Sequence, residues 1–167
     1  MSFNYVREPG NGFTHLFGAI LSFVGLLALV IKTSIVMPTP LAITSVIIFG
    51  ISMILLYTAS TVYHLVISSD KVIAWLRKID HSMIFVLIAG SYAPFCMISL
   101  NGKGGYALFA IVSIAAIAGV CFKLIWFNCP RWISTIIYIA MGWVSVALIV
   151  PLYHALSLSG LMLLVVG

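Results

Sequence analysis

Five long apolar runs constrain this chain more than any other feature of its sequence. They lie near residues 13–31, 41–67, 79–100, 105–127 and 132–153. A helix of about 20 apolar residues crosses the hydrocarbon core of a membrane, which is about 30 Å thick. Short polar breaks separate the runs, so neighbouring helices are expected to be antiparallel. The sequence therefore predicts an all-α, polytopic transmembrane helix bundle.

The composition supports this class. Hydrophobic residues make up 63% of the 167 residues and charged residues only 7%, whereas a soluble domain carries about 25% charged residues. The net charge of +5 comes from 8 scattered Lys and Arg residues that form no stripe, so we expect no nucleic-acid partner. The 3 cysteines lack a CxxC spacing, and we interpret them as packing residues.

A sixth apolar run begins near Leu158 and continues to Gly167. About ten helical residues span only about 15 Å, roughly half of the hydrocarbon core. A helix that stops at this depth leaves its last carbonyl groups without partners. We therefore expect a single membrane domain over residues 1–167, with five full helices and part of a sixth at 158–167, and we expect that the chain ends prematurely.

Basic residues are distributed unevenly between the two ends of the runs. One end is flanked by Arg7, Lys71, Arg77, Lys78, Lys123 and Arg131, and the other end only by Lys32 and Lys103. Because basic flanks favour the cytoplasm, we expect a cytoplasmic N-terminus. Val72, Leu76 and Ile79 recur at helical spacing before the third run. This segment is interpreted either as a short amphipathic turn on the membrane surface or as an ordinary basic loop.

Two short polar clusters, Ser60 to His64 and Asp80 to Ser82, stand at the facing ends of the second and third runs. An ionisable side chain costs about 3 kcal/mol at the centre of a membrane, so these clusters indicate a function. Ser60 and His64 are four residues apart and share one helix face, and Asp80 is expected at a similar depth. A neutral imidazole is a common metal ligand, and a nearby carboxylate can position a metal-bound water.

The alternative is that these groups lie at the headgroup level and make only structural contacts. Asp80 would then cap the start of a helix and stabilise its dipole. One histidine and one carboxylate are too few for zinc, which usually needs three or four protein ligands. The spacing alone leaves both interpretations open.

Three motifs distinguish between these interpretations. They are Glu8-Pro-Gly-Asn11-Gly-Phe-Thr14-His15, Tyr57-Thr-Ala-Ser60-Thr-Val-Tyr63-His64, and Asp80-His81-Ser82 followed by Ala89-Gly90-Ser91-Tyr92-Ala93-Pro94-Phe95. Together they resemble the hemolysin III family, which is related to the adiponectin and progestin receptor family and to the alkaline ceramidases. The resemblance covers essentially the whole chain. It implies seven transmembrane helices with a cytoplasmic N-terminus and a multi-pass protein of the plasma membrane.

For the chemistry, the resemblance implies a zinc ion held by His64 and by two histidines four residues apart on a seventh helix. Ser60 and Asp80 match nearby polar residues of the family, and Asp80 is expected to position or deprotonate a zinc-bound water. No two histidines stand four residues apart in this chain, so two of the three expected ligands are absent from it. His15 or His81 would replace them only if their rings converged on His64, and His81 is expected to face away from Asp80.

Other residues carry secondary expectations. His154 is expected at the outer end of the fifth run, as an interfacial residue far from the polar clusters. Lys123 is expected to reach the cytoplasmic interface with its long side chain. Pro94 is expected to kink or break the helix of the third run, which either opens a cavity for a lipid or is a packing feature. Small residues such as Gly25 and Gly90 are expected to permit close helix contacts.

Two principal functions follow. The first is a zinc-dependent, membrane-embedded hydrolase of lipid-like amides or esters, with His64 as metal ligand and Asp80 and Ser60 as catalytic residues. The second is a pore-forming hemolysin or channel, and a membrane receptor or sensor is a further alternative. A pore requires a polar stripe through the whole bilayer, whereas these polar groups cluster at one depth, which favours the hydrolase. Membrane lipids are the expected partners and a lipid-like molecule the expected substrate; the oligomeric state stays open.

Overall fold

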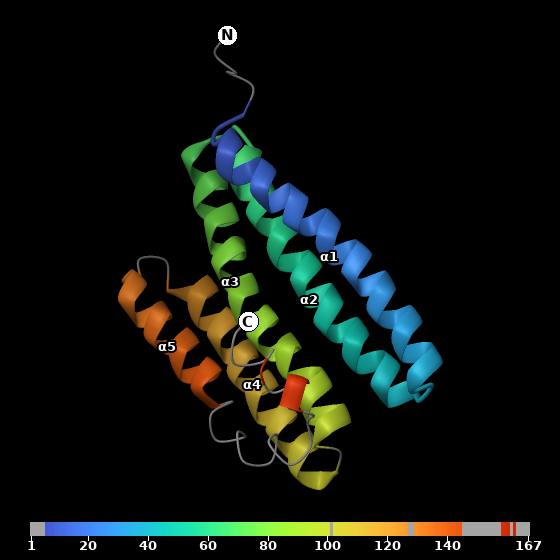
Figure 1. Cartoon of the computed structure of the whole chain (residues 1–167). Helices are drawn as coiled ribbons and strands as arrows, with labels where there is room; N and C mark the ends of the chain where they lie inside the picture. The colour runs from blue at the N-terminus through green and yellow to red at the C-terminus, as the bar shows by residue number, and fades with distance from the viewer. Residues whose placement is uncertain (1–5, 101, 127–128, 145–157, 161, 163–167) are drawn as a thin grey trace.

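The protein folds as a bundle of long helices, shown in Figure 1. This computed structural model describes residues 6–100, 102–126, 129–144, 158–160 and 162. The elements are α1 (Pro9–Val36), α2 (Pro40–Leu65), α3 (Asp70–Pro94), the π-helical turn η1 (Phe95–Ser99), α4 (Lys103–Ile125) and α5 (Arg131–Trp143). No strand occurs in these described ranges. The predicted all-α class is confirmed.

Four of the helices are long and apolar enough to cross a membrane. They are Pro9–Val36, Pro40–Leu65, Asp70–Ser99 and Gly104–Ile125, and a shorter apolar helix covers Trp132–Trp143. The predicted polytopic bundle is confirmed by these segments. The rest of the fifth run and most of the sixth, including His154, lie outside the described residues.

The start of the third helix differs from the prediction of 79–100. α3 begins at Asp70, so the segment with Val72 and Leu76 forms its first turns and is neither a separate surface turn nor a loop. A helix tolerates charged side chains where it extends beyond the hydrocarbon core. The Asp70 carboxylate lies in the first turn of α3, where it interacts favourably with the positive end of the helix dipole and stabilises the helix. Asp80 is therefore well inside α3, and its interpretation as a helix cap is wrong.

Pro94 changes the character of the same helix. The regular α-helical bonding of α3 ends at this residue, and the chain continues as the π-helical turn η1. Proline lacks the backbone N–H that the α-helical pattern would use, and π turns are a recurring way to absorb such a defect. The expected local break at Pro94 is confirmed.

α3 is the central element of the bundle. It contacts α2 on one side and both α4 and α5 on the other, while α1 contacts α2. The buried core gathers on α3 and its neighbours: Phe85, Ala89, Tyr92, Cys96, Val112, Ala116 and Met141. The Tyr92 hydroxyl donates to the Met141 carbonyl oxygen at 2.8 Å, which ties α3 to α5 through a buried hydrogen bond.

Glycine residues permit close contacts of α1 and of α3 with α2. A Cβ atom at Gly18 would collide with the Tyr57 ring of α2, and one at Gly90 would collide with the Ser52 side chain of α2. The expected role of small residues is confirmed at these positions. At Gly25 a Cβ atom would meet nothing within 4 Å, so the expectation is wrong there.

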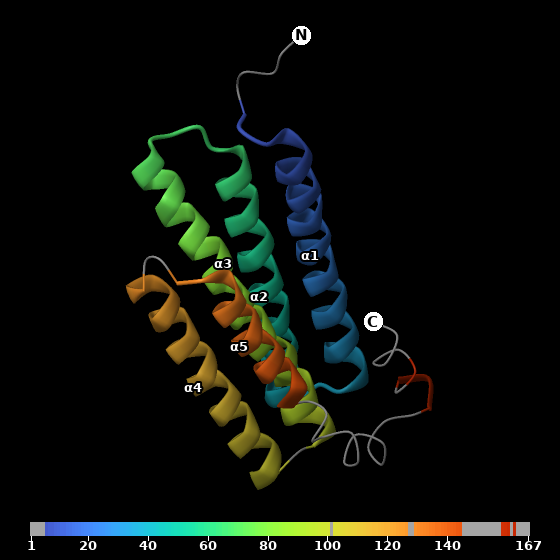
Figure 2. The same cartoon turned by 90° about the vertical axis from the view of Figure 1, so that its left-hand side faces the viewer.

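The arrangement brings the polar ends of several helices together. The start of α1, the end of α2 and the start of α3 meet at one end of the bundle, as the two views in Figures 1 and 2 show. The end of α4 and the start of α5 point toward the same end of the bundle. The motif residues at these termini therefore become neighbours although they are far apart in the sequence.

Candidate functional site

A cavity of about 500 Å³, here called the polar cavity, lies where these helix ends meet. Its walls come from four helices, with Tyr63 and His64 of α2, Arg77, Asp80, His81 and Ile84 of α3, Lys123 of α4, and Ser134, Thr135 and Tyr138 of α5. The structure thus brings the predicted residues His64 and Asp80 to one cavity. Nine of these ten described residues are polar and carry imidazole, carboxylate, cationic or hydroxyl groups, and Ile84 is aliphatic.

Two other predicted residues are placed differently. Ser60 is buried in α2, with 5% of its surface exposed, and is not among the residues that line the polar cavity. His81 lines the cavity together with Asp80, and its backbone carbonyl accepts a hydrogen bond from the Tyr138 hydroxyl at 2.8 Å. Adjacent helical residues point about 100° apart, so the expectation that the His81 ring faces away from Asp80 stays a prediction.

The segment before α1 closes the end of α2. The backbone N–H of Arg7 donates to the Leu65 carbonyl at 3.3 Å, and that of Glu8 donates to the His64 carbonyl at 2.9 Å. The Arg7 guanidinium also donates to the Tyr63 carbonyl at 2.5 Å. The last carbonyl groups of a helix have no intrahelical partner, so this segment satisfies three of them. It fixes the position of His64 relative to α1.

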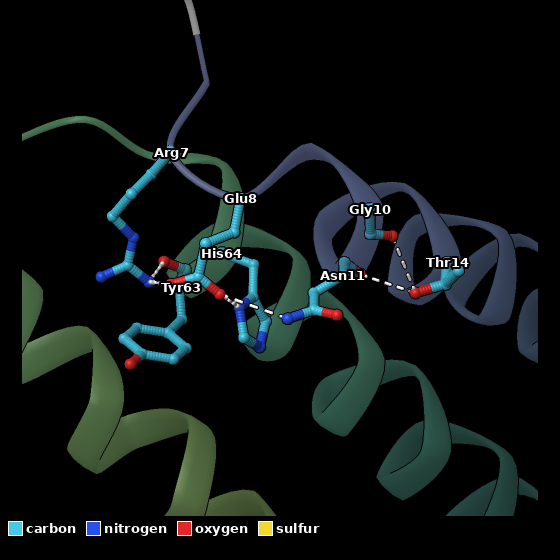
Figure 3. Close-up of polar contacts among 7 residues, drawn as sticks. All are labelled: Arg7, Glu8, Gly10, Asn11, Thr14, Tyr63 and His64. Atoms are coloured by element: carbon cyan, nitrogen blue, oxygen red, sulfur yellow. Dashed lines mark hydrogen bonds and ion pairs between the residues drawn. The ribbon is translucent and has the colours of Figure 1, made fainter.

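Glu8 binds the His64 side chain directly, as Figure 3 shows. The distance between His64 Nδ1 and Glu8 Oε2 is 2.7 Å. An ionised carboxylate only accepts hydrogen bonds, so Nδ1 is the donor in this contact, and the neutral tautomer that fits it has Nε2 as its acceptor. The hydrogen bond from His64, followed by one from Asn11, lowers the pKa of Glu8 below its usual 4.5. Glu8 is therefore ionised at neutral pH and orients the ring.

Aromatic contacts hold the same ring from its faces. The His15 ring of α1 stacks on His64, with centroids 5.4 Å apart and an angle of 11° between the planes. The Tyr63 ring lies 4.7 Å from His64, and the Arg7 guanidinium lies 4.3 Å from the centre of Tyr63. His15 thus supports His64 through its ring face.

A complete metal site requires several ligands close to one another. Among the described residues, no group of three or more His, Cys, Asp or Glu side chains is placed to hold a metal ion. Catalytic zinc usually has three protein ligands. The described part of the chain therefore does not form a zinc site by itself. The rings of His15 and His64 stack on each other and do not converge on a common point where a metal ion could bind.

Two buried lysines occupy the boundary between α3, α4 and α5. Lys123 is 8% exposed, and its Nζ donates to Ser134 Oγ at 2.9 Å. Lys78 is 7% exposed, and its Nζ donates to the Leu124 carbonyl at 2.9 Å. The expectation that Lys123 extends to the interface is wrong, because its ammonium group turns inward to α5. Only Lys123 of the two lines the polar cavity.

Sequence reasoning missed the role of Glu8 and the cavity position of Lys123. Glu8 belongs to the first motif, which was a usable signal, but its partner His64 is 56 residues away and only the packing of α1 on α2 brings them together. Lys123 is a basic residue near the end of an apolar run. Its burial depends on where α5 begins relative to α4, which no local pattern encodes.

A second cavity, here called the apolar cavity, has a similar volume of about 520 Å³ and lies among α2, α3 and α4. In its described lining, Ser52 and Ser113 are the only hydroxyl residues, and none is charged. Aliphatic side chains such as Ile48, Leu55 and Val120 make up most of its wall. Of the two cavities, only the polar cavity has charged residues and imidazoles in its described lining.

The comparisons with known proteins agree with this arrangement. A family described as Haemolysin-III related matches residues 3–167. The chain belongs to the hemolysin III family. It is 42% identical to Hemolysin-3 of Bacillus cereus over 163 residues, which is 96% of this chain and 73% of that protein. It is 39% identical to the Hemolysin-3 homolog of Bacillus subtilis (strain 168) over 165 residues, which is 99% of this chain and 76% of that protein.

No solved structure matches this hemolysin III family chain significantly. The family therefore explains the three motifs and the multi-pass helical architecture, while the contacts of the individual residues come from the structure described above.

Proposed function

We propose that this hemolysin III family protein is a membrane-embedded hydrolase of lipid-like amides or esters, with the polar cavity as its reaction site. The observation that supports the proposal is that His64 and Asp80 line one cavity although they come from different helices. Hydrolysis needs a group that accepts a proton from water and a group that positions the reacting carbonyl. A cavity at the end of a membrane-spanning bundle is accessible to both water and lipid. We place the protein in the plasma membrane.

The residues divide the work as follows. Asp80 orients the attacking water and accepts its proton, and the proton passes to the leaving amine or alkoxide when the carbonyl carbon–heteroatom bond breaks. Glu8 holds the His64 ring through Nδ1, at 2.7 Å, so that Nε2 stays available to the reacting group. Ser60, one turn before His64, supports that part of α2 from inside the bundle. Glu8 and Ser60 act through other residues and are positioning residues.

The first prediction tests the reaction directly. Asp80→Asn removes the proton acceptor while it keeps the size of the side chain, so kcat/KM should fall about a hundredfold or more. The measurement is release of fatty acid from lipid amides and esters by the purified full chain in lipid vesicles. Lys32→Ala is the control, because Lys32 is an exposed residue near the far end of α1. Equal rates for Asp80→Asn and Lys32→Ala would refute the role of Asp80.

Zinc binding is a separate prediction, which depends on the family resemblance. His64 is the one ligand that the resemblance assigns to this chain, and zinc in such a site acts as a Lewis acid and lowers the pKa of water. Elemental analysis of protein purified from membranes should find less zinc in His64→Ala than in the natural sequence. Lys32→Ala should keep the full zinc content, and identical content in both variants would contradict the prediction.

The name of the Bacillus cereus relative, Hemolysin-3, raises the alternative of a pore. A pore needs a polar path across the bilayer. In the described residues, the polar cavity is confined to one end of the bundle and the apolar cavity carries no charged side chain. This separation favours the hydrolase. Dye release from vesicles that rises with protein concentration and is equal in Asp80→Asn would instead support the pore.

A further inference from the structure

Lys123 is the most unusual side chain of the polar cavity. It is 8% exposed and lines the cavity, and its Nζ donates to the neutral hydroxyl of Ser134 at 2.9 Å. Within the described residues, both ion pairs involve Glu8, and no carboxylate lies within 4.0 Å of Lys123 Nζ. A buried ammonium group is costly unless an anion accompanies it. No described carboxylate therefore pairs directly with this cation, although Asp80 lines the same cavity.

The other groups around Lys123 fit an anion. Arg77 supplies a second cation from α3, and Ser134, Thr135 and Tyr138 supply hydroxyl groups from α5. Asp80 is the only carboxylate residue in the described lining. A phosphate group has several oxygen atoms that accept charge-assisted hydrogen bonds from lysine, arginine and hydroxyl donors.

We propose that the part of the polar cavity formed by Lys123, Ser134 and Arg77 binds the phosphate group of an anionic lipid. Phosphate on a lipid is favoured over free phosphate, because the cavity lies among the ends of membrane-spanning helices and Ile84 also lines it. The inference deepens the proposed function, on which its role as a substrate site rests. The substrate class becomes phosphate-bearing lipid amides or esters, with the phosphate at Lys123 and the labile bond toward His64 and Asp80.

Lys78 is a natural control for Lys123. It is equally buried, at 7% exposed, and it joins the same pair of helices through the Leu124 carbonyl of α4. Its Nζ also lies 5.0 Å from the centre of the Trp75 ring. Lys78 does not belong to the lining of the polar cavity. Loss of its charge should therefore affect packing without affecting a bound phosphate.

The experiment measures lipid binding without turnover, by native mass spectrometry or calorimetry of the full chain in detergent micelles. The probes are phosphatidic acid and diacylglycerol with the same ether-linked chains, which an ester hydrolase does not cleave, and inorganic phosphate. Lys123→Met should weaken phosphatidic acid binding about tenfold or more, because it removes a charge-assisted hydrogen bond in a buried site. Lys78→Met should change this affinity less than twofold. Diacylglycerol should bind the natural sequence more weakly than phosphatidic acid and should be insensitive to Lys123→Met.

Two further measurements keep the result decisive if Lys123→Met folds poorly. Lys123→Arg keeps the charge and should retain most of the phosphatidic acid affinity. The preference of the natural sequence for phosphatidic acid over diacylglycerol needs no variant at all. Equal binding of these two lipids, or equal weakening by Lys123→Met and Lys78→Met, would overturn the proposal.

Inorganic phosphate identifies the source of the group. Failure of millimolar phosphate to displace phosphatidic acid supports a lipid headgroup, whereas displacement with an affinity equal to that of the lipid shows that free phosphate is the ligand and overturns the lipid assignment. Binding and hydrolysis fail independently. Binding that depends on Lys123, without hydrolysis of any lipid, would support this inference and refute the proposed function. Hydrolysis of neutral lipids alone would support the proposed function and refute this inference.

Discussion

The polar and apolar cavities have nearly equal volumes, about 500 and 520 Å³, and both use α3 as a wall. They differ in chemistry because α3 presents different faces to them. Ile84 lines the polar cavity and Val86 lines the apolar cavity, and two residues along a helix are about 200° apart. One helix therefore separates a site with charges and imidazoles from a space with none. A membrane protein can hold ionisable groups at low cost when one end of the bundle supplies their partners.

The largest expected effect comes from placing the same charge in each cavity. Ala116→Asp puts a carboxylate into the apolar cavity, where Ala116 is 5% exposed, and should lower the free energy of unfolding by about 3 kcal/mol. Ser134→Asp puts a carboxylate beside the Lys123 ammonium, now 2.9 Å from Ser134 Oγ, and should cost about 2 kcal/mol less. Unfolding of both variants in mixed detergent micelles measures the difference.

Ala116→Asn controls for the added volume, because the amide has nearly the same shape as the carboxylate without its charge. It should cost clearly less than Ala116→Asp. Ser134→Asp should also reduce phosphatidic acid binding at the polar cavity, because its new carboxylate would occupy the place of the bound phosphate. Equal costs for Ala116→Asp and Ser134→Asp would mean that the two cavities do not differ in their tolerance of charge.

A smaller effect separates two glycines, one at the apolar cavity and one away from it. Gly90→Ala should lower the free energy of unfolding by about 1 kcal/mol or more, because the new methyl group collides with Ser52. The energetic cost of this collision should exceed the gain from the higher helix propensity of alanine. Gly25→Ala meets nothing within 4 Å and should be neutral or stabilising. Thermal unfolding of both variants in the same detergent decides between them. A stabilising Gly90→Ala would show that α2 and α3 lie farther apart than the structure has them.

The fold was largely predictable because the membrane imposes a single length scale. Apolar runs of sufficient length had to become spanning helices, and four of them do. Charged residues misled the prediction at α3, where Lys71, Arg77 and Lys78 left open a basic loop although the helix includes all three. Hydropathy reports where a helix enters lipid, and it cannot report how far the same helix continues into water.

The candidate site was predictable only in part. Motif residues gave His64 and Asp80, and the structure places both at one cavity. The partners Glu8 and Lys123 depend on how α1 packs on α2 and how α5 packs on α4. Such contacts between residues that are distant in sequence follow from tertiary packing, which the pattern of one run cannot specify. Ser60 shows the opposite error. It is four residues before His64 and was predicted on the same helix face, but it is not among the residues that line the polar cavity.

The smallest expected effect concerns pH and again separates the two cavities. Hydrogen bonds from His64 first and Asn11 second lower the pKa of Glu8 in the folded protein. A lowered carboxylate pKa adds stability above the unfolded value of about 4.5, and this stability is lost as the pH falls through the folded value. The natural sequence should therefore lose more stability between pH 6 and pH 3, roughly, than Glu8→Gln does.

The change should be modest, because the Glu8 side chain is 41% exposed and solvent screens its interactions. Unfolding free energies of the natural sequence, Glu8→Gln and Ala116→Asn across this pH range provide the comparison. Ala116→Asn alters only the apolar cavity, whose described lining contains no carboxylate or imidazole, so its curve should run parallel to that of the natural sequence. If Glu8→Gln also ran parallel, the Glu8–His64 contact would not stabilise the folded state, and the orientation of His64 would depend on its ring contacts with His15 and Tyr63.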